Sequence, residues 1–360
     1  MQLKNKVIVA AAGSGKTTFI VNEALKNAPK KTLIVTFTNK NREEIEKKIN
    51  TLHGFIPKYI VVKSWYSFLL ADLIRPYQNT VYEDRIEGVY FPNGPVNRYI
   101  SKSNFKAFFL NNKNEVNKDR ISELAELVAQ KCEYKTITRL SELYDYIFID
   151  EVQDMAGYDL EIFNYLMYSP INTLFVGDIR QATYSTNNTT KNRKYKGINI
   201  INYFMEKSEI CEVDQSLNVS HRCNQMICDF ADGLFEGMAS TLSKNEKQTG
   251  HDGVFMIHPN DIEEYIQRYN PQCLRYDART ALPRAINFGD SKGLTFDRVL
   301  IKPTAKMEKY LKTGELVLDE TTLAKFYVAL TRAKYSVGII SATKNVKVNG
   351  ISNFVEEIIR

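Results

Sequence analysis

The N-terminal residues carry the feature that most restricts the fold. Residues 7–10 form an apolar run typical of a buried strand, and the glycine-rich stretch 11–15 leads directly into a helical pattern over 16–27. A glycine loop between a strand and a helix presents backbone N–H groups to phosphate, and the helix N-terminus adds a positive dipole. We therefore expect a phosphate-binding loop, with Lys16 reaching the β- and γ-phosphates and Thr17 ligating magnesium. The residues expected to bind nucleotide are Ala12, Gly13, Ser14, Gly15, Lys16, Thr17 and Thr18.

Apolar runs and helical stretches alternate along the whole chain. The runs expected as strands cover 7–10, 32–36, 59–62, 146–149, 173–176, 208–213, 254–257, 273–276, 299–301 and 337–341. Such alternation predicts parallel sheets covered by helices, the α/β class. We expect a first domain over 1–205, interrupted by an inserted subdomain at about 75–140, and a second domain over 206–360. The run 208–213 is assigned to the second domain, and residues 352–359 are expected to form a helix at its end.

A second chemical signal follows the predicted strand 146–149, where Asp150 and Glu151 are adjacent. Carboxylates at a strand end suit magnesium binding and activation of water, so Asp150 is expected to hold the metal and Glu151 to polarise the attacking water. Such a pair alone is common in surface loops. Together with a phosphate loop in the same domain it becomes a specific prediction.

The insertion interleaves cations with aromatic residues over 98–109. Two interpretations stay open: a surface for single-stranded nucleic acid, and a small subdomain whose aromatic residues form its own core. The second interpretation is favoured.

Composition restricts the class of protein less sharply. The sequence has 48 Lys and Arg against 42 Asp and Glu, a net charge of +6 that is compatible with an anionic partner. Its five cysteines are scattered without a C-x-x-C pair, which supports neither a zinc site nor a disulfide framework. No apolar run approaches the roughly 18 residues of a membrane span, and the N-terminus does not resemble a signal peptide. A soluble, cytoplasmic protein is expected.

Taken in order, these residues resemble the superfamily 1 helicases of the UvrD/Rep/PcrA type. The matching segments are 10–17, 33–40 (a "T-F-T-N" motif), 64–68, 149–154, 176–184 ("V-G-D-x-x-Q"), 220–222, 291–296 ("K-G-L") and 328–333 ("V-A-x-T-R-A"). The resemblance implies two RecA-like motor domains that use ATP and Mg²⁺ to move along single-stranded DNA with 3′-to-5′ polarity. The resemblance also allows for an accessory protein partner.

The resemblance also implies residue roles. The residues expected in catalysis are Lys16, Glu151, Gln181, Arg222 and Arg332. The two arginines would act on the γ-phosphate, and Gln181 would sense it; Gly293 is grouped with the nucleotide-binding residues. The residues expected to contact the nucleic acid are Thr36, Phe37, Thr38, Asn39, Ser64, Trp65 and Tyr184.

Several positions depart from the family pattern. Only Gln2 stands near the place of the upstream glutamine that reads adenine, Thr295 replaces a sugar-contacting glutamate, and Gly289 replaces a histidine. No tryptophan follows Tyr184, and the insertions are small, which favours translocation over processive unwinding. Three alternatives remain: an RNA-directed motor, an ATP-switched binding protein without strand separation, and a P-loop kinase or GTPase. The last lacks an acceptor motif and leaves Arg332 unexplained.

Overall fold

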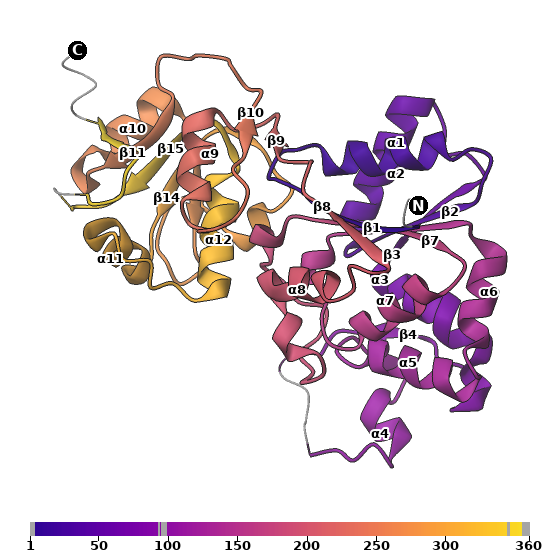
Figure 1. The fold of residues 1–360 in the computed structure, drawn as a ribbon. Coiled ribbons are helices and arrows are strands. Elements are labelled where there is room, and N and C mark those ends of the chain that lie inside the picture. The colour runs from indigo at the N-terminus through magenta and orange to yellow at the C-terminus, as the bar shows by residue number, and fades with distance from the viewer. Residues whose placement is uncertain (1–3, 93, 95–98, 344–345, 355–360) are drawn as a thin grey trace. The chain divides into compact units, whose positions relative to one another are not determined.

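The computed structural model describes residues 4–92, 94, 99–343 and 346–354, drawn as a ribbon in Figure 1. Within this part the chain divides into two compact units. The first holds the segment ending at Val9 together with Lys16–Ile179 and Ser185–Asp214, and the second holds Ala10–Gly15, Arg180–Tyr184 and the segment from Gln215 onward. The sequence predicted a boundary at 205/206 and did not anticipate that two short early segments would group with the second unit.

The first unit is built on a parallel sheet that has six strands among the described residues, in the order β3-β2-β6-β7-β1-β8. The strands are Asn5–Val9 (β1), Thr32–Thr36 (β2), Ile60–Ser64 (β3), Tyr146–Asp150 (β6), Asn172–Gly177 (β7) and Cys211–Asp214 (β8). Every residue of β2 is buried, because strands inside such a sheet are covered on both faces. The predicted α/β class is confirmed for this unit.

Helices cover both faces of this sheet. Lys16–Lys26 (α1) and Asn39–His53 (α2) lie on one face, and Trp65–Phe68 (α3) and Asp159–Tyr168 (α7) lie on the other (Figure 1). This division follows from right-handed crossovers. The chain crosses the sheet in one direction from β1 through β2 to β3 and then in the other direction from β3 to β6, so the connecting helices change face. The Thr38 hydroxyl caps α2 by accepting from the Asn41 N–H at 3.1 Å.

Strand β8 corrects the sequence-based domain assignment. The run 208–213 was predicted as the first strand of the second domain, but Cys211–Asp214 pairs in parallel with β1, from Asn5 opposite Cys211 to Ile8 opposite Asp214. The Asn5 side chain reinforces this edge, because its Nδ2 donates to the Ile210 carbonyl at 2.8 Å. The chain therefore returns to the first sheet before it enters the second.

The insertion replaces a single crossover helix with several short elements. They are Leu69–Ile74, Arg75–Thr80, Gly88–Tyr90 (β4), Phe105–Phe109 (α4), Glu115–Asn117 (β5), Ile121–Lys131 (α5) and Lys135–Leu143 (α6). Phe109 is buried, Phe105 stacks on Tyr82 with ring centroids 5.3 Å apart, and Tyr99 is exposed. The core interpretation of this aromatic stretch therefore holds for Phe105 and Phe109 but not for Tyr99; Arg98 lies outside the described residues.

The second unit contains another parallel sheet, also with six strands in the described part of the chain, in the order β13-β12-β14-β15-β11-β16. The strands are Gly253–Ile257 (β11), Gln272–Arg275 (β12), Ile286–Asn287 (β13), Phe296–Lys302 (β14), Ala333–Ile340 (β15) and Ile351–Asn353 (β16). Its helices are Gln225–Asp232 (α9), Ile262–Tyr269 (α10), Ala305–Thr313 (α11) and Glu320–Leu330 (α12), and Val219–Ser220 (β9) pairs with Leu242–Ser243 (β10).

The helix predicted over 352–359 is wrong at its start. Residues 352–353, expected to begin a helix, belong to strand β16, which pairs with β11. The remainder of the expected helix, from residue 355, lies outside the described residues, as does Gln2 at the other end of the chain.

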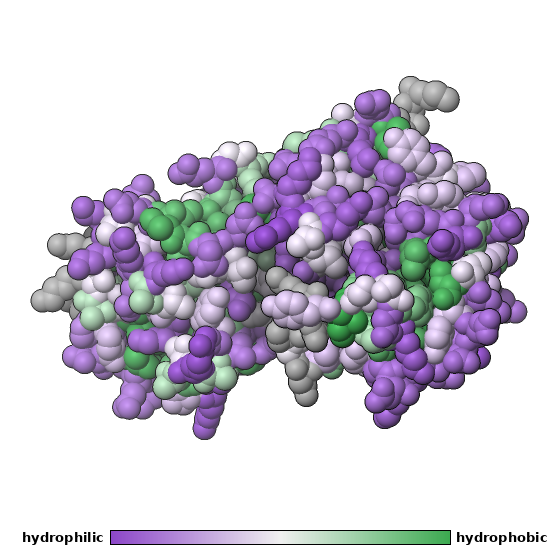
Figure 2. All heavy atoms as spheres, turned by 90° about the horizontal axis from the view of Figure 1, so that it is seen from below, coloured by the Kyte–Doolittle hydropathy of each residue, from purple (hydrophilic) through white to green (hydrophobic). Residues whose placement is uncertain are grey.

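The surface shown in Figure 2 is mainly polar, with apolar patches scattered over it. Across the described ranges, we find no helix with the length and apolar character needed to cross a membrane. The five cysteines are free thiols, and all are buried.

Candidate functional site

The glycine-rich segment forms a tight loop between β1 and α1. Gly13 and Gly15 adopt φ angles of +74° and +80°, in the left-handed region that favours glycine. Lys16 is the first residue of α1, Thr17 and Thr18 follow it, and the first turn of this helix has no acidic side chain. The loop and the helix dipole therefore favour an anion at this point.

Residues Ala10–Gly15 group with the second unit through specific contacts. The Ala11 N–H donates to the Leu217 carbonyl and the His221 N–H donates to the Gly13 carbonyl, both at 2.9 Å. A Cβ added at Gly13 would lie 2.7 Å from the Arg222 Cβ, whereas one added at Gly15 would meet nothing within 4 Å. Gly13 is therefore required for a close approach as well as for its backbone angle, and Gly15 for its angle alone.

The carboxylate pair stands at the end of β6. Asp150 is buried and its Oδ2 accepts from the Thr36 hydroxyl at 3.5 Å. Glu151 takes φ +57° and ψ 40°, a left-handed conformation that is strained for a residue other than glycine. Gln153 Nε2 donates to Glu151 Oε2. The strained turn directs two adjacent carboxylates differently: Asp150 inward, and Glu151 to a half-exposed position.

These groups share one edge of the first sheet. Because β1, β2, β6 and β7 are parallel, their carboxyl ends meet at one edge, where open α/β sheets bind ligands. The glycine-rich loop follows β1, Thr36 ends β2 and Asp150 ends β6. The Thr17 hydroxyl and the Asp150 carboxylate are hard oxygen donors of the kind that magnesium prefers, so the donor set fits this ion.

In the second unit, the two predicted arginines meet at Thr331. Arg222 Nη1 donates to the Thr331 carbonyl at 3.0 Å, and Arg332 Nη2 donates to the Thr331 hydroxyl at 3.3 Å. Arg332 is 1% exposed, and its Nε donates to the Val328 carbonyl at 3.0 Å. Its Nη2 also donates to Gln181 Oε1 at 3.4 Å. The structure therefore brings together three residues that the sequence predicted from separate motifs.

Gln181 is flanked by further contacts of the same unit. Arg180 Nη1 forms an ion pair with Asp232 Oδ1 at 2.6 Å, and both side chains are largely buried. Lys292 Nζ donates to the Gln181 carbonyl at 3.3 Å and lies 5.9 Å from the ring centre of Tyr184. Tyr184 is 44% exposed, so part of its ring is available to a ligand. Gly293 is exposed and has φ +84°.

The residues predicted to contact nucleic acid differ in exposure. Asn39 is exposed, Phe37 and Thr38 are half-buried, and Ser64 is buried with its hydroxyl 2.9 Å from that of Ser67. Thr36 is fully buried and donates to Asp150, so its side chain serves the carboxylate rather than the surface. This corrects the expectation of a nucleic-acid contact through the Thr36 side chain.

Trp65 requires a larger correction. Its side chain is 0% exposed and packs against Phe68 and Phe163, with ring centroids 5.6 and 5.8 Å apart. Its indole N–H donates to Asp159 Oδ1 at 2.9 Å. No face of this ring is open to a base, so Trp65 belongs to the core and not to a nucleic-acid surface.

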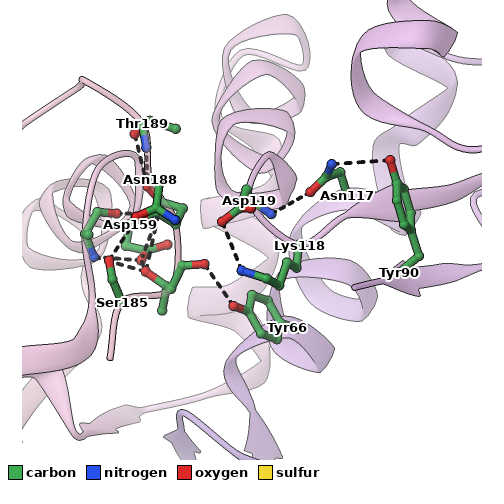
Figure 3. A network of polar contacts seen from close by, with 12 residues as sticks. Tyr66, Tyr90, Asn117, Lys118, Asp119, Asp159, Ser185, Asn188 and Thr189 are labelled. Carbon is green, nitrogen blue, oxygen red and sulfur yellow. Dashed lines mark hydrogen bonds and ion pairs between the residues drawn. The ribbon is translucent and has the colours of Figure 1, made fainter. Parts of the chain in front are cut away.

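Asp159 itself is the centre of a buried polar network, which we call the Asp159 hub (Figure 3). Its carboxylate accepts from Trp65 Nε1, Ser122 Oγ, the Ala156 N–H, Thr186 Oγ1 and Asn187 Nδ2. Burial raises the pKa of Asp159, and the donors oppose that shift. The hub joins α3, α5 and α7 to the segment that follows Tyr184.

Sequence reasoning missed two aromatic residues, Tyr66 and Phe91, that lie near a residue predicted to contact nucleic acid, Phe37. The ring centroid of Tyr66 lies 6.1 Å from that of Phe37 and 5.6 Å from that of Phe91, and both pairs are packed edge to face. Phe91 is 63% exposed. Tyr66 could have been found from the 64–68 motif, where it stands next to Trp65, but Phe91 belongs to the insertion and no motif marks it.

Comparisons with known proteins agree with this architecture. The model of a protein family described as "AAA domain" matches residues 1–187, slightly more than half of the chain. A search of curated proteins gives no match.

Among solved structures, the fold resembles that of Arterivirus nonstructural protein 10, a helicase, with a TM-score of 0.51 and 14% identity over 94% of this chain and 60% of that one. The PRRSV helicase (TM-score 0.48, 15% identity, 96% and 55% covered) and Arterivirus nonstructural protein 10 in complex with DNA (0.49, 15%, 94% and 62%) are also similar. This chain thus spans about 60% of the length of those proteins. Because the family model covers more than half of the sequence, the chain belongs to the AAA domain family.

Proposed function

We propose that this protein is a nucleic-acid-dependent ATPase that moves along single-stranded DNA as a helicase-like motor of the UvrD/Rep/PcrA type, with 3′-to-5′ polarity. The observation that carries the proposal is the loop between β1 and α1, in which Gly13 and Gly15 hold left-handed angles at the same sheet edge as Asp150 and Glu151. The similarity of the fold to a helicase supports the motor class.

In the proposed mechanism the first unit binds nucleotide and activates water. Backbone N–H groups of the loop and the Lys16 ammonium bind the phosphates of ATP. Thr17 and Asp150 would hold a magnesium ion, which would supply positive charge to neutralise the phosphates of the nucleotide. Glu151 orients the attacking water and accepts its proton.

The second unit supplies transition-state charge. Arg222 and Arg332 act on the γ-phosphate as it leaves, and Gln181, bonded to Arg332, senses whether the phosphate is present. Arginines in this role accelerate phosphoryl transfer by about 10³- to 10⁵-fold. Nucleotide-dependent closure of the two units would then alternate their grip on the strand. Thr38, Asn39, Phe37 and Tyr184 are the proposed contacts to that strand.

The test is steady-state ATP hydrolysis alone, with single-stranded DNA and with single-stranded RNA, using Glu151→Gln as the blank. Strong stimulation by DNA that is absent in the blank supports the proposal, and preferential stimulation by RNA replaces it with an RNA-directed motor. Turnover that ignores both polymers, or none, overturns the motor and favours an ATP-switched binding protein. Displacement of a labelled strand from substrates with a 3′ or a 5′ overhang tests the polarity.

A further inference from the structure

An aromatic row crosses the first unit from the motif residues into the insertion. We use this name for Phe37, Tyr66 and Phe91, whose rings meet edge to face. Phe37 and Tyr66 are half-buried, while Phe91 is 63% exposed at the outer end of the row. A large aromatic ring that packs against one neighbour and is otherwise largely exposed can stack on a base.

The middle of the row is fixed in place by the Asp159 hub. The Tyr66 hydroxyl donates to the Thr186 carbonyl at 2.9 Å (Figure 3). Thr186 in turn donates to Asp159 through its side chain. Burial and the nearby carboxylates of Asp159 and Asp119 raise the pKa of Tyr66, so its hydroxyl stays protonated and keeps donating. The position of Tyr66, and with it the ring that packs against Phe91, is therefore preorganised.

The segment that holds Tyr66 also holds a cation, Lys196. Lys196 is half-buried, and burial, with the charge of Arg193, lowers its pKa, whereas Asp119 acts in the opposite direction. Its ammonium donates to a neutral acceptor, Asn188 Oδ1, at 3.1 Å. Over the described residues, no carboxylate forms an ion pair with Lys196. A partly buried ammonium with a neutral partner and a like charge nearby favours an incoming anion.

Two links place Lys196 close to the row. Asn188, which holds Lys196, follows Thr186, which holds Tyr66, by two residues. Asp119 also influences the pKa of both Tyr66 and Lys196, so its carboxylate lies within electrostatic reach of both. The Asp119 carboxylate forms an ion pair with Lys118, whose Nζ lies 3.0 Å from Asp119 Oδ1. The Lys196 ammonium is therefore in the neighbourhood of the row, whose outer end exposes the Phe91 ring.

We propose that Phe91 and Lys196 form a subsite for one further nucleotide of a single strand, beyond the contacts that the helicase motifs supply. The base stacks on the open face of Phe91, and the adjoining phosphate binds the Lys196 ammonium. This inference rests on the proposed function and adds a contact from the insertion to it. It also gives the small insertion a role that its core packing does not explain.

The experiment compares variants in binding labelled oligo-dT by fluorescence anisotropy, with a ladder that lengthens by single nucleotides and a salt titration. The variants are Phe91→Ala, Phe91→Trp and Lys196→Ala. Phe55→Ala and Lys58→Ala are the matched controls, because Phe55 is 62% exposed and Lys58 is exposed in the same unit. Thermal melts check that each variant is folded.

Phe91→Ala should weaken binding by about 5-fold or more, since stacking contributes about 1–3 kcal/mol per base. It should also shorten by one nucleotide the length at which affinity stops rising, while Phe91→Trp keeps both. Lys196→Ala should reduce the slope of log affinity against log salt by about 0.7.

If the wild type binds and Phe91→Ala behaves like Phe55→Ala, the subsite is refuted and the motor proposal stands. If the wild type binds neither labelled oligo-dT nor a labelled oligo-U of the same length, both proposals are refuted. Unchanged salt dependence in Lys196→Ala, with loss in Phe91→Ala, would refute the phosphate half of the subsite alone.

Discussion

Replacing Asp159 with asparagine tests whether the hub holds the first unit together. The two carboxylate oxygens each accept from a group that can only donate: Oδ1 from the Trp65 indole N–H at 2.9 Å, and Oδ2 from the Ala156 N–H at 3.0 Å. Ser122 and Thr186 can rotate their hydroxyls to accept, but Trp65 and Ala156 cannot. An asparagine amide therefore satisfies one fixed donor and turns its NH₂ group against the other, whichever way it faces.

The expected cost follows from that geometry. A buried donor left without an acceptor costs about 1–3 kcal/mol, and a hydrogen bond to a charged group is worth about 1.5–3 kcal/mol. These contributions overlap, so we expect Asp159→Asn to lower the free energy of unfolding of the first unit by about 2–4 kcal/mol. For a unit of this size, that corresponds to a fall in Tm of roughly 5–15 °C.

The sequence itself supplies the probe. Trp65 is the single tryptophan of the chain and lies in the core of the first unit, so its fluorescence reports unfolding of that unit. Asp145→Asn is the matched control. That carboxylate is exposed, and its Oδ2 accepts from one fixed donor, the Lys31 N–H at 2.8 Å, which an asparagine oxygen can replace. If Asp159→Asn melts within a degree or two of Asp145→Asn, the hub does not stabilise the first unit as expected.

Further variants test the phosphate loop and the arginines. Lys16→Ala should abolish ATP turnover without changing the Tm, and retained turnover would refute the phosphate role of Lys16. Gly15→Ala should lower the free energy of unfolding by about 1 kcal/mol, from its left-handed angle alone. Gly13→Ala should lower it by more, because the added Cβ would lie 2.7 Å from the Arg222 Cβ. Both are measured by urea unfolding, and equal losses of free energy would contradict that contact. Arg332→Ala should keep nucleic-acid binding but slow turnover by about 10³-fold or more, measured below the Tm of the variant, and normal turnover would exclude Arg332 from the catalytic step.

Much of the fold could be predicted because its signals are local. Residues 32–36 carry five consecutive residues that suit a buried strand, and the observed strand has those same bounds. The loop at Gly13 and Gly15 was predicted from a glycine-rich stretch between an apolar run and a helical pattern, and both glycines hold the left-handed angles that favour this residue. The strand end at Asp150 was predicted for the same local reason, as an apolar run that stops at two carboxylates.

The failures concern partners that are distant in the sequence. Strand β8 has only four residues, and nothing in them tells which sheet they will join; hydrogen bonds with β1, some two hundred positions earlier, decide it. Trp65 was predicted to face a ligand because it stands within a motif, whereas Asp159, far along the chain, holds it in the core. Burial is a property of the packed unit, and a motif does not encode it.

The sequence by itself therefore determined the class of the fold, the glycine-rich loop between β1 and α1 and the order of the motif residues, because backbone propensity and short-range spacing depend on consecutive residues. Only the tertiary structure decided that Arg222, Arg332 and Gln181 meet around Thr331. It alone brought Phe91 of the insertion against Tyr66 of a motif segment. The physical reason is the same in each case: side chains that are far apart in the chain come into contact only when the sheets and their helices have packed.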